Sequence, residues 1–591
     1  MEEEREMEQK APVEEKTPPG EGTPAEENMP TEEKAPVEEK TPPEERTPAE
    51  ENIPTEEKAP VEEKKPMEED TPTGETTTLE EKTPMEEKTA LEKDTPTEDK
   101  TPAEKKTAEE GKTPVEENTV VKRKLQQLDH ESLTLSDAKI KNSNIIRRHT
   151  DIKPAIELLA KLGMQEDAIS ETVRAHLRLE KEAKCFVPLI QDWIWGKFNI
   201  CVPVRVESSK FKGTVMMRFP KPYALAESYY PGSIEEKLRA EVGAYSWFQQ
   251  KCPDIRIPHL YGFGIANRHY MLIEYIPPET GRMLSSTWKS QKNDPSRRKN
   301  LFQGLARIMI SMSRIPQPRI GSFQFNDDCT VSLTGRPASA AATLLENGGA
   351  ERSIGSKQTY TCTEPYVSDV ISLHDDHFYV DVNATDSEDD CRGLMSTRVL
   401  LRALSHRYIK KECRYGPFML QLTDLHQSNI FVTENWEVAC LIDLEWICAL
   451  PPESQQVPYW LACQDISDIV DTKESQKLTE FNALRQEFMQ ALSEEESKVN
   501  LPWPLTKIME ETWQSGATWF WHSLASVNAA YYLFQDHICP RFSTDLTPPI
   551  TSVLANFWRE GGGEEVVAKK VADFERYQHD LDCLFAKMTQ A

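Results

Sequence analysis

The spacing of apolar residues beyond about residue 150 predicts a small unit of mixed helix and strand. Apolar positions at helical spacing predict two amphipathic helices within residues 154–183, split near Gly163. Apolar runs predict strands at Phe198–Val206, Gly213–Pro220 and His269–Ile276, with a helix at Ser233–Gln250 and a hairpin turn at Tyr261–Asn267. The hairpin turn sits between two strands, so the resulting order of strand, strand, helix, strand, strand indicates an α+β unit.

Helical periodicity dominates the rest of the chain. It predicts helices at Ser296–Ile315, Leu394–Glu412, Leu478–Ser497, Thr518–Gln535 and Glu564–Lys587. Residues 322–395 are polar with a Gly/Ala/Ser-rich patch, and we expect them to be irregular. Between Leu422 and Trp446 the pattern changes to a hairpin, in which the apolar runs "NIFV" and "EVACLID" flank the turn "TENW".

Residues 11–118 repeat a hexad of the form x-P-x-E-E-K. They hold about 17 of the 41 prolines and no Cys, Phe, Tyr or Trp, and residues 1–118 carry roughly −23 of the net charge of −29. Proline breaks helices, and so little apolar surface cannot offset the entropy of ordering, so residues 1–120 are predicted to be a disordered acidic tail. A solenoid is disfavoured because no apolar residue stacks into a core. The tail is either a spacer that can bind a basic protein partner or a low-complexity expansion without function.

Charge and cysteine usage narrow the function classes further. The acidic balance argues against nucleic-acid binding, which needs clustered Lys and Arg, and the basic run Val121–Lys124 is too short to change this. No apolar stretch approaches the length of a membrane span, and the N-terminus has no apolar signal region. The 12 cysteines form no C-x-x-C pair, which argues against zinc and favours reduced thiols in the cytoplasm or nucleus.

Five polar residues with candidate chemistry gather in the hairpin segment: Asp424, His426, Asn429, Asp443 and Glu445. The hairpin brings Asp443 back alongside Asn429. Phosphoryl transfer needs bound metal ions and a base that orients the attacking hydroxyl, and Mg²⁺ prefers carboxylate and amide oxygens. Asp424 is therefore a candidate base, and Asn429 and Asp443 are candidate metal ligands. The alternative is a hairpin whose polar groups only cap turns.

The stretch "TDLHQSNIFV…LIDLEW" resembles the aminoglycoside phosphotransferase family, small-molecule kinases that share the protein-kinase-like fold with choline kinases. The family pattern is G-D-x-H-x-x-N followed by I-D-x-E, and Gly321–Pro337 and Val457–Trp460 further resemble its fungal branch. The resemblance covers about residues 190–540. It implies a two-lobed fold, with a β-rich nucleotide-binding N-lobe over 186–280 and a helical C-lobe over 281–591. The residue pattern adds a helical lead-in over 121–185 and an irregular polar insert at 336–395 within the C-lobe.

The resemblance also implies roles for individual residues, with ATP and Mg²⁺ as cofactors. Asp424 would be the catalytic base, His426 would orient its loop, Asn429 and Asp443 would bind the metal, and Glu445 would support the metal site. In the N-lobe, Gly196 would belong to the turn over the phosphates, Arg218 would face the α- and β-phosphates, Glu241 would pair with Arg218, and the backbone of Glu274 and Ile276 would meet adenine.

Two departures from the family pattern leave two functions open. Leu422 stands where the family often has His, and Arg218 replaces Lys, which exchanges a point charge for a planar fork. The first function is an ATP- and Mg²⁺-dependent phosphotransferase acting on a hydroxyl of a small molecule, with Asp465, Asp468 and Glu445 favouring a cationic substrate. The second is a catalytically impaired kinase-like binding module with an acidic interaction tail. A protein kinase is disfavoured because "LEW" follows Asp443 where Phe-Gly would be expected.

Overall fold

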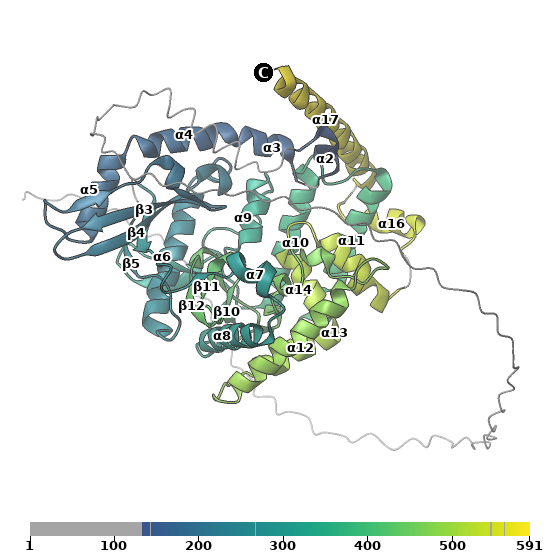
Figure 1. Ribbon diagram of the computed structural model, residues 1–591. Helices are drawn as coiled ribbons and strands as arrows, with labels where there is room; N and C mark the ends of the chain where they lie inside the picture. The colour runs from purple at the N-terminus through teal and green to yellow at the C-terminus, as the bar shows by residue number, and fades with distance from the viewer. Residues whose placement is uncertain (1–132, 142, 266–267, 544–545, 561, 591) are drawn as a thin grey trace, which may run out of the picture. The chain divides into compact units, whose positions relative to one another are not determined.

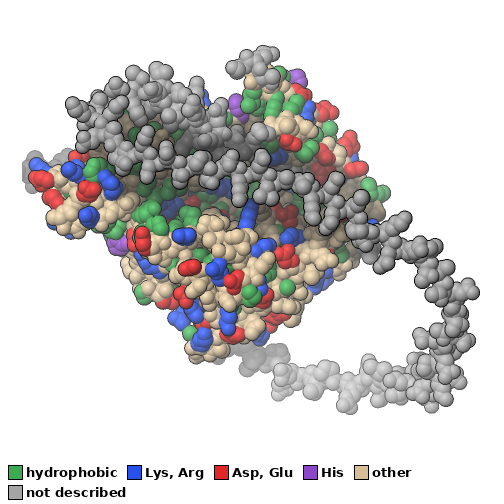
Figure 2. All heavy atoms as spheres, in the orientation of Figure 1, with side chains coloured by type: hydrophobic (Ala, Val, Ile, Leu, Met, Phe, Trp, Pro, Cys, Tyr) green, Lys and Arg blue, Asp and Glu red, His purple; other side chains and the backbone are tan. Residues whose placement is uncertain are grey.

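The computed structural model describes residues 133–590 except 142, 266–267, 544–545 and 561. The predicted tail over 1–120, the basic run Val121–Lys124 and the lead-in up to residue 132 lie outside the described residues. Within the described part, no helix combines the length and apolarity that crossing a bilayer requires. On the face seen in Figure 2, Lys and Arg side chains are interspersed with Asp and Glu over the coloured surface.

A six-stranded antiparallel sheet forms the strand-rich part and confirms the predicted α+β class. Its strands are β1 (Lys184–Phe186), β2 (Ile194–Trp195), β3 (Asn199–Glu207), β4 (Lys212–Pro220), β5 (Leu260–Gly264) and β6 (Tyr270–Glu274). The order is β1-β3-β4-β6-β5, and β2 pairs with β3. Part of the predicted turn at Tyr261–Asn267 instead belongs to β5, because Phe263 pairs with Met271 across the ladder.

Helices cover both faces of this sheet (Figure 1). Ile200, Val202, Val204 and Val206 alternate along β3 and pack on α4 (Ile152–Gly163) and α5 (Glu166–His176), the two helices predicted to split near Gly163. Met271 and Ile273 of β6 pack on the other side, in one apolar cluster with Leu238 and Val242 of α6 (Ser233–Lys251). Side chains alternate along a strand, so Arg218 in β4 lies on the face opposite Val215 and Met217.

The rest of the described chain is mainly helical. Its helices are α2 (Leu135–Ile140), α3 (Ile145–Thr150), α7 (Ser285–Gln291), α8 (Pro295–Ser313), α9 (Ala340–Asn347), α10 (Thr363–Val380), α11 (Glu388–Tyr408), α12 (Lys477–Glu496), α13 (Leu505–Ser515), α14 (Ala517–Ala525), α15 (Ala530–Leu533), α16 (Pro548–Ala555) and α17 (Gly563–Gln590). Short strands are β7 (Arg282–Met283), β8 (Ser322–Phe325), β9 (Val331–Gly335), β10 (Met419–Leu422), β11 (Ile430–Val432), β12 (Val438–Leu441) and β13 (Ile447–Leu450). They form three further antiparallel sheets, β8-β9, β10-β13 and β12-β11-β7.

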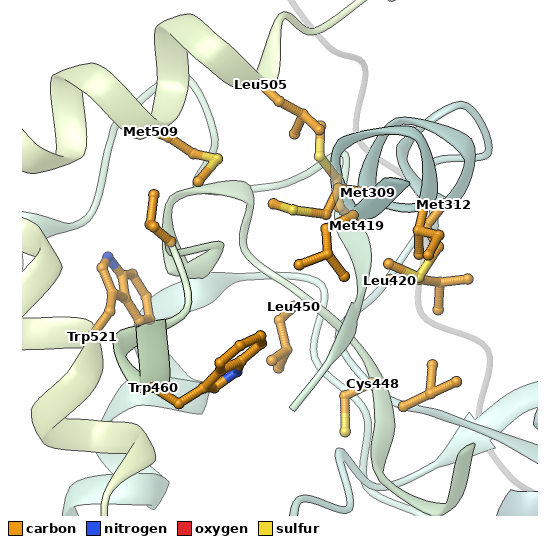
Figure 3. Packing of buried hydrophobic residues seen from close by; sticks show 14 of the residues in the cluster. Met309, Met312, Met419, Leu420, Cys448, Leu450, Trp460, Leu505, Met509 and Trp521 are labelled. Atoms are coloured by element: carbon orange, nitrogen blue, oxygen red, sulfur yellow. The ribbon is translucent and has the colours of Figure 1, made fainter. Parts of the chain in front are cut away.

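The main apolar core lies beneath the predicted hairpin segment. Met309 and Met312 of α8 pack against Met419 and Leu420 of β10, and Met509 of α13 lies in the same cluster (Figure 3). Methionine has a flexible, polarisable side chain that fills irregular gaps between elements of different direction. This core fixes β10 and β13, the pair of strands from which the candidate site projects.

The prediction that residues 336–395 form an irregular insert was wrong. The segment holds α9, α10 and the start of α11. In α10, Val367, Ile371, His374 and Phe378 are buried at a spacing of three or four residues, and Leu373 is buried on another side, so the helix is held by packing on more than one face.

The predicted helix Thr518–Gln535 is also not continuous. It is divided into α14, α15 and a π-helix at Phe534–Ile538. At the break, the Ser526 hydroxyl accepts a hydrogen bond from the Ala529 N–H (3.1 Å), and such local bonds compete with helix formation.

Buried histidines predict a loss of stability in acid. His374 is 6% exposed, and burial lowers its pKa to about 4. An unfolded histidine titrates near 6.5, so the unfolded chain binds the proton that the folded chain excludes. The stabilisation is therefore complete above about pH 6.5 and declines as the pH falls towards 4. When the pH falls from 7 to 5, the unfolding free energy of the parent should decrease by about 2 kcal/mol more than that of a His374→Gln variant. Denaturant titration at the two pH values measures both decreases. Equal losses would contradict this assignment.

Candidate active site

The predicted hairpin is confirmed and brings Asn429 and Asp443 together. Ile430 of β11 pairs with Leu441 of β12, and the Ile442 N–H donates to the Asn429 carbonyl (3.0 Å). Each candidate ligand therefore adjoins the ladder, Asn429 immediately before β11 and Asp443 two residues after β12. Asp443 adopts left-handed backbone angles (φ 64°, ψ 64°), a conformation rare for residues other than glycine and frequent at functional sites.

Asp424, Asn429 and Asp443 line one small cavity of about 10 Å³, enclosed by the apolar side chains of Leu422, Leu425, Leu441, Ile442 and Trp446. Such a volume holds about one water-sized species. The Asn429 amide nitrogen donates to the backbone carbonyl of Asp424 (2.9 Å), which fixes the amide and the loop relative to each other. Leu422, which departs from the family pattern, contributes apolar wall here and no hydrogen bond from its side chain.

Asp424 has a proton affinity suited to neutral pH. Burial, together with the nearby Asp443 and Glu445 carboxylates, raises its pKa to about 7, and the Lys197 ammonium opposes the rise. Lys197 stands at the tip of the turn between β2 and β3, so the sheet contributes one cation to the surroundings of Asp424. A carboxylate whose pKa lies near the working pH can accept a proton from a hydroxyl.

Five charged side chains form a buried cluster beside this cavity: Arg218, Lys237, Glu241, Asp443 and Glu445. The Arg218 guanidinium contacts Glu241 and Asp443 at 2.5 Å each. Burial and the Glu445 carboxylate raise the pKa of Asp443, and Arg218 opposes the rise. For Glu445, burial favours the neutral acid, but Lys237 and Arg218 lower the pKa below its ordinary value.

Lys237 and Asn199 are members of this site that the sequence analysis missed. Lys237 lies one helical turn before Glu241 in α6, and its ammonium contacts Glu241 (2.8 Å), Glu445 and the Asn199 side-chain carbonyl (3.0 Å). The Asn199 amide nitrogen donates to Glu445 (2.7 Å). The available signal was the i, i+4 spacing of Lys237 and Glu241, which places both on one helix face.

Glu445 is therefore paired with cations of the chain itself. Its Oε2 faces Lys237, Asn199 and Arg218, whereas Oε1 is buried without a hydrogen-bond partner in the described structure. At 1% exposure its side chain has no access to a substrate, so the expectation that Glu445 helps to select a cationic substrate was wrong. Glu241, Asp443 and Glu445 offer oxygens within 4.8 Å of one another, but Arg218 and Lys237 already contact all three carboxylates and offset two of their three negative charges.

Asn429 and Asp443 fit a hard divalent cation better. Among the described residues, neither the Asn429 Oδ1 nor the Asp443 Oδ2 accepts a hydrogen bond, and both side chains line the small cavity. One amide oxygen and one carboxylate match the few protein ligands that Mg²⁺ takes while it keeps water and phosphate oxygens.

His426 shapes the loop through a backbone contact. Its Nδ1 accepts a hydrogen bond from the Ser428 N–H (3.2 Å) at the start of the 3₁₀ turn Gln427–Asn429. Burial lowers the pKa of His426, and Lys197 adds to the effect, so the ring is neutral at pH 7. This contact orients the turn that ends at Asn429.

The turn Trp195–Asn199 is tight and lies beside the Glu445 loop. The Gly196 N–H donates to the Asn199 carbonyl (3.0 Å), and the Lys221 ammonium donates to the Gly196 carbonyl (2.6 Å). The Phe198 ring meets the Trp446 ring edge-on, with 5.0 Å between centroids. These contacts fix Gly196 and its neighbours near the Asp424 cavity.

Glu274 and Ile276 lie apart from this cluster, three and five residues beyond Met271, the partner of Arg218 in the sheet. The Glu274 carboxylate contacts Arg256 (2.5 Å), and its N–H donates to the His259 carbonyl (2.8 Å). Across the described residues, the Ile276 backbone has no hydrogen-bond partner. The Ile276 peptide is thus available to a ligand, whereas the Glu274 N–H is not.

No family model matches the chain, and no curated protein matches it. Among solved structures, the chain is similar to a choline kinase from Cryptosporidium parvum Iowa II, with 12% identity and a TM-score of 0.32 over 71% of this chain and 96% of that chain. It is also similar to a macrolide 2'-phosphotransferase type I, with 10% identity and a TM-score of 0.29 over 64% of this chain and 96% of that chain.

Proposed function

We propose that the protein is a phosphotransferase that uses ATP and Mg²⁺ to phosphorylate a hydroxyl of a small molecule. The observation that carries the proposal is the shared cavity of Asp424, Asn429 and Asp443. A candidate base and two candidate metal ligands, separated by up to 19 positions in sequence, converge on one small cavity, as phosphoryl transfer requires of a base and the metal it acts beside. The resemblance of "TDLHQSNIFV…LIDLEW" to the aminoglycoside phosphotransferase family, and with it a two-lobed kinase-like fold, agrees with this arrangement.

The proposed reaction needs only positioning and one proton transfer from the chain. Asp424 accepts the proton of the substrate hydroxyl while the hydroxyl oxygen bonds to the γ-phosphorus of ATP. The bond from that phosphorus to the bridging oxygen breaks, and ADP leaves. Asn429 and Asp443 would hold Mg²⁺, which neutralises charge on the phosphates when bound. Arg218 supplies a cation from the sheet, and the free Ile276 peptide offers hydrogen-bonding groups to adenine.

The alternative is a catalytically impaired kinase-like binding module. The contact between Arg218 and Asp443 favours it, because a cation of the chain lies where the metal would bind. The two functions differ in whether nucleotide binding depends on Mg²⁺.

Thermal denaturation of the full chain with ATP, with and without Mg²⁺, tests the proposal. Binding to the native state stabilises it by about 2.7 kcal/mol at a ligand concentration of 100 times Kd. We expect a Mg²⁺-dependent rise in the midpoint that is absent in Asp443→Ala. A matched control, Asp580→Ala, removes an exposed carboxylate on α17 and should behave like the parent. No rise at millimolar Mg·ATP would favour the binding module.

A further inference from the structure

We infer that Lys237 is a positioning residue, and that it leaves Arg218 free to exchange Asp443 for a nucleotide phosphate when a divalent cation binds. This inference rests on the proposed function. It assigns different tasks to the two buried cations: Lys237 stays with the glutamates, and Arg218 changes partner.

All three N–H donors of the Lys237 ammonium have acceptors within the chain itself. Its side chain is 4% exposed, and its three acceptors are Glu241 (2.8 Å), the Asn199 carbonyl (3.0 Å) and Glu445. An ammonium group has three N–H donors, so none remains for a ligand. Lys237 therefore acts through the residues it holds, and it joins α6 to β3 and to the loop after β12.

Arg218 stands at the boundary between this buried group and the cavity. One terminal nitrogen contacts Glu241 at 2.5 Å, and the other contacts Asp443 at 2.5 Å and Glu445 at the longer distance of 3.5 Å. Asp443 is the more accessible partner, with 26% of its side chain exposed against 1% for either glutamate. The Asp443 contact is thus the one that a ligand can reach and replace.

The charges of the cluster explain why the exchange needs Lys237. Glu241 and Glu445 carry two negative charges, and Lys237 neutralises one of them. Without Lys237, both glutamates would hold the guanidinium of Arg218, since the attraction between charges is strong in a buried environment. With Lys237 in place, a divalent cation that takes Asp443 leaves the outer nitrogen of Arg218 without its anion, and a phosphate is the replacement. Metal and nucleotide then bind with positive coupling, because each removes the other's competitor.

The same charges predict how two variants behave. The probe is Mn²⁺, which shares the preference of Mg²⁺ for oxygen ligands and whose free concentration is measured by electron paramagnetic resonance. Arg218→Met removes the competitor for Asp443, so we expect it to bind Mn²⁺ alone at least tenfold more tightly than the parent. In the parent, ATP should increase Mn²⁺ affinity at least tenfold. In Lys237→Met this increase should fall towards onefold, and in Lys237→Met/Glu445→Gln, where the charge is balanced again, it should return.

A control variant and three contrary results distinguish failure of this inference from failure of the proposed function. Arg239→Met removes a half-buried cation of the same helix, which pairs with Glu235 and Asp327 and donates to the Phe325 carbonyl (3.0 Å), and it should match the parent in Mn²⁺ affinity and coupling. Equal Mn²⁺ affinity in the parent and Arg218→Met would overturn the exchange, and undiminished coupling in Lys237→Met would overturn the role of Lys237. If Lys237→Met does not fold, the double variant decides, and its failure to restore coupling rejects the inference. A parent that binds no Mn·ATP would reject the proposed function itself.

Discussion

Replacing Asp424 by Asn should lower kcat by about 10²- to 10⁴-fold, the range over which a positioned general base accelerates a reaction. Asn has nearly the shape of Asp but cannot accept the hydroxyl proton. The Mg²⁺-dependent thermal shift with ATP should persist, because Asn429 and Asp443 are unchanged. The readout is ADP formation across a panel of small molecules that carry hydroxyl groups, followed by kcat and KM for any that react.

Asp465→Asn is the matched control for this prediction. Burial raises the pKa of Tyr459, and the nearby Asp465 and Asp424 carboxylates add to the rise. The Asp465 carboxylate itself accepts a hydrogen bond from the Ser467 N–H (2.9 Å). We expect Asp465→Asn to retain kcat within a few-fold. An Asp424→Asn variant that keeps the parent's kcat would show that Asp424 is not the base.

Truncating Trp436 to Ala should lower the unfolding free energy by about 3–5 kcal/mol, the usual cost of removing a buried Trp. Trp436 is 1% exposed and stacks on Trp288, with ring centroids 5.4 Å apart, and its indole N–H donates to the Thr287 hydroxyl (3.1 Å). These contacts attach the turn of the β11–β12 hairpin to α7. The loss is measured by denaturant titration.

Two further variants test the cause of that loss. Trp436→Phe keeps a ring against Trp288 but no donor for Thr287, so its loss should be smaller. Tyr415→Ala removes an aromatic residue that is 72% exposed and should change the unfolding free energy by no more than about 0.5 kcal/mol. A Trp436→Ala loss below about 1 kcal/mol would mean that the hairpin does not depend on this anchor.

The sequence was most informative where local pattern and topology agree. The runs "NIFV" and "EVACLID" are short, apolar and joined by a tight turn, so their pairing and the approach of Asp443 to Asn429 followed directly. The face of the sheet on which Arg218 lies also follows from the sequence, because side chains alternate between the two faces along a strand. The fit of α6 against that face then determines its contact with Glu241.

Other parts depended on tertiary contacts that periodicity does not reveal. α10 interrupts its apolar positions with Ser, Asp and His, and two of these polar residues, His374 and Asp375, are themselves buried. Lys237 lies in "EEKLRAE", a run typical of a solvated helix surface, and only packing against β3 and the loop after β12 makes it a buried cation. The division at Ser526 arises from a side-chain hydrogen bond, which no hydrophobic spacing encodes.

The C-terminal helix has a consequence for the order in which the protein forms during synthesis. Ala138 of α2 and Ile145 of α3 are buried against Tyr577 and Leu581 of α17, and the Ile145 N–H donates to the Tyr577 hydroxyl (3.0 Å) across 432 positions of sequence. At roughly 5–20 residues per second, the ribosome delivers Tyr577 about 20–90 seconds after Ile145. The residues of the sheet and the hairpin are synthesised before α17, so α2 and α3 lack this apolar partner during that time. The first described helices are therefore among the last to dock.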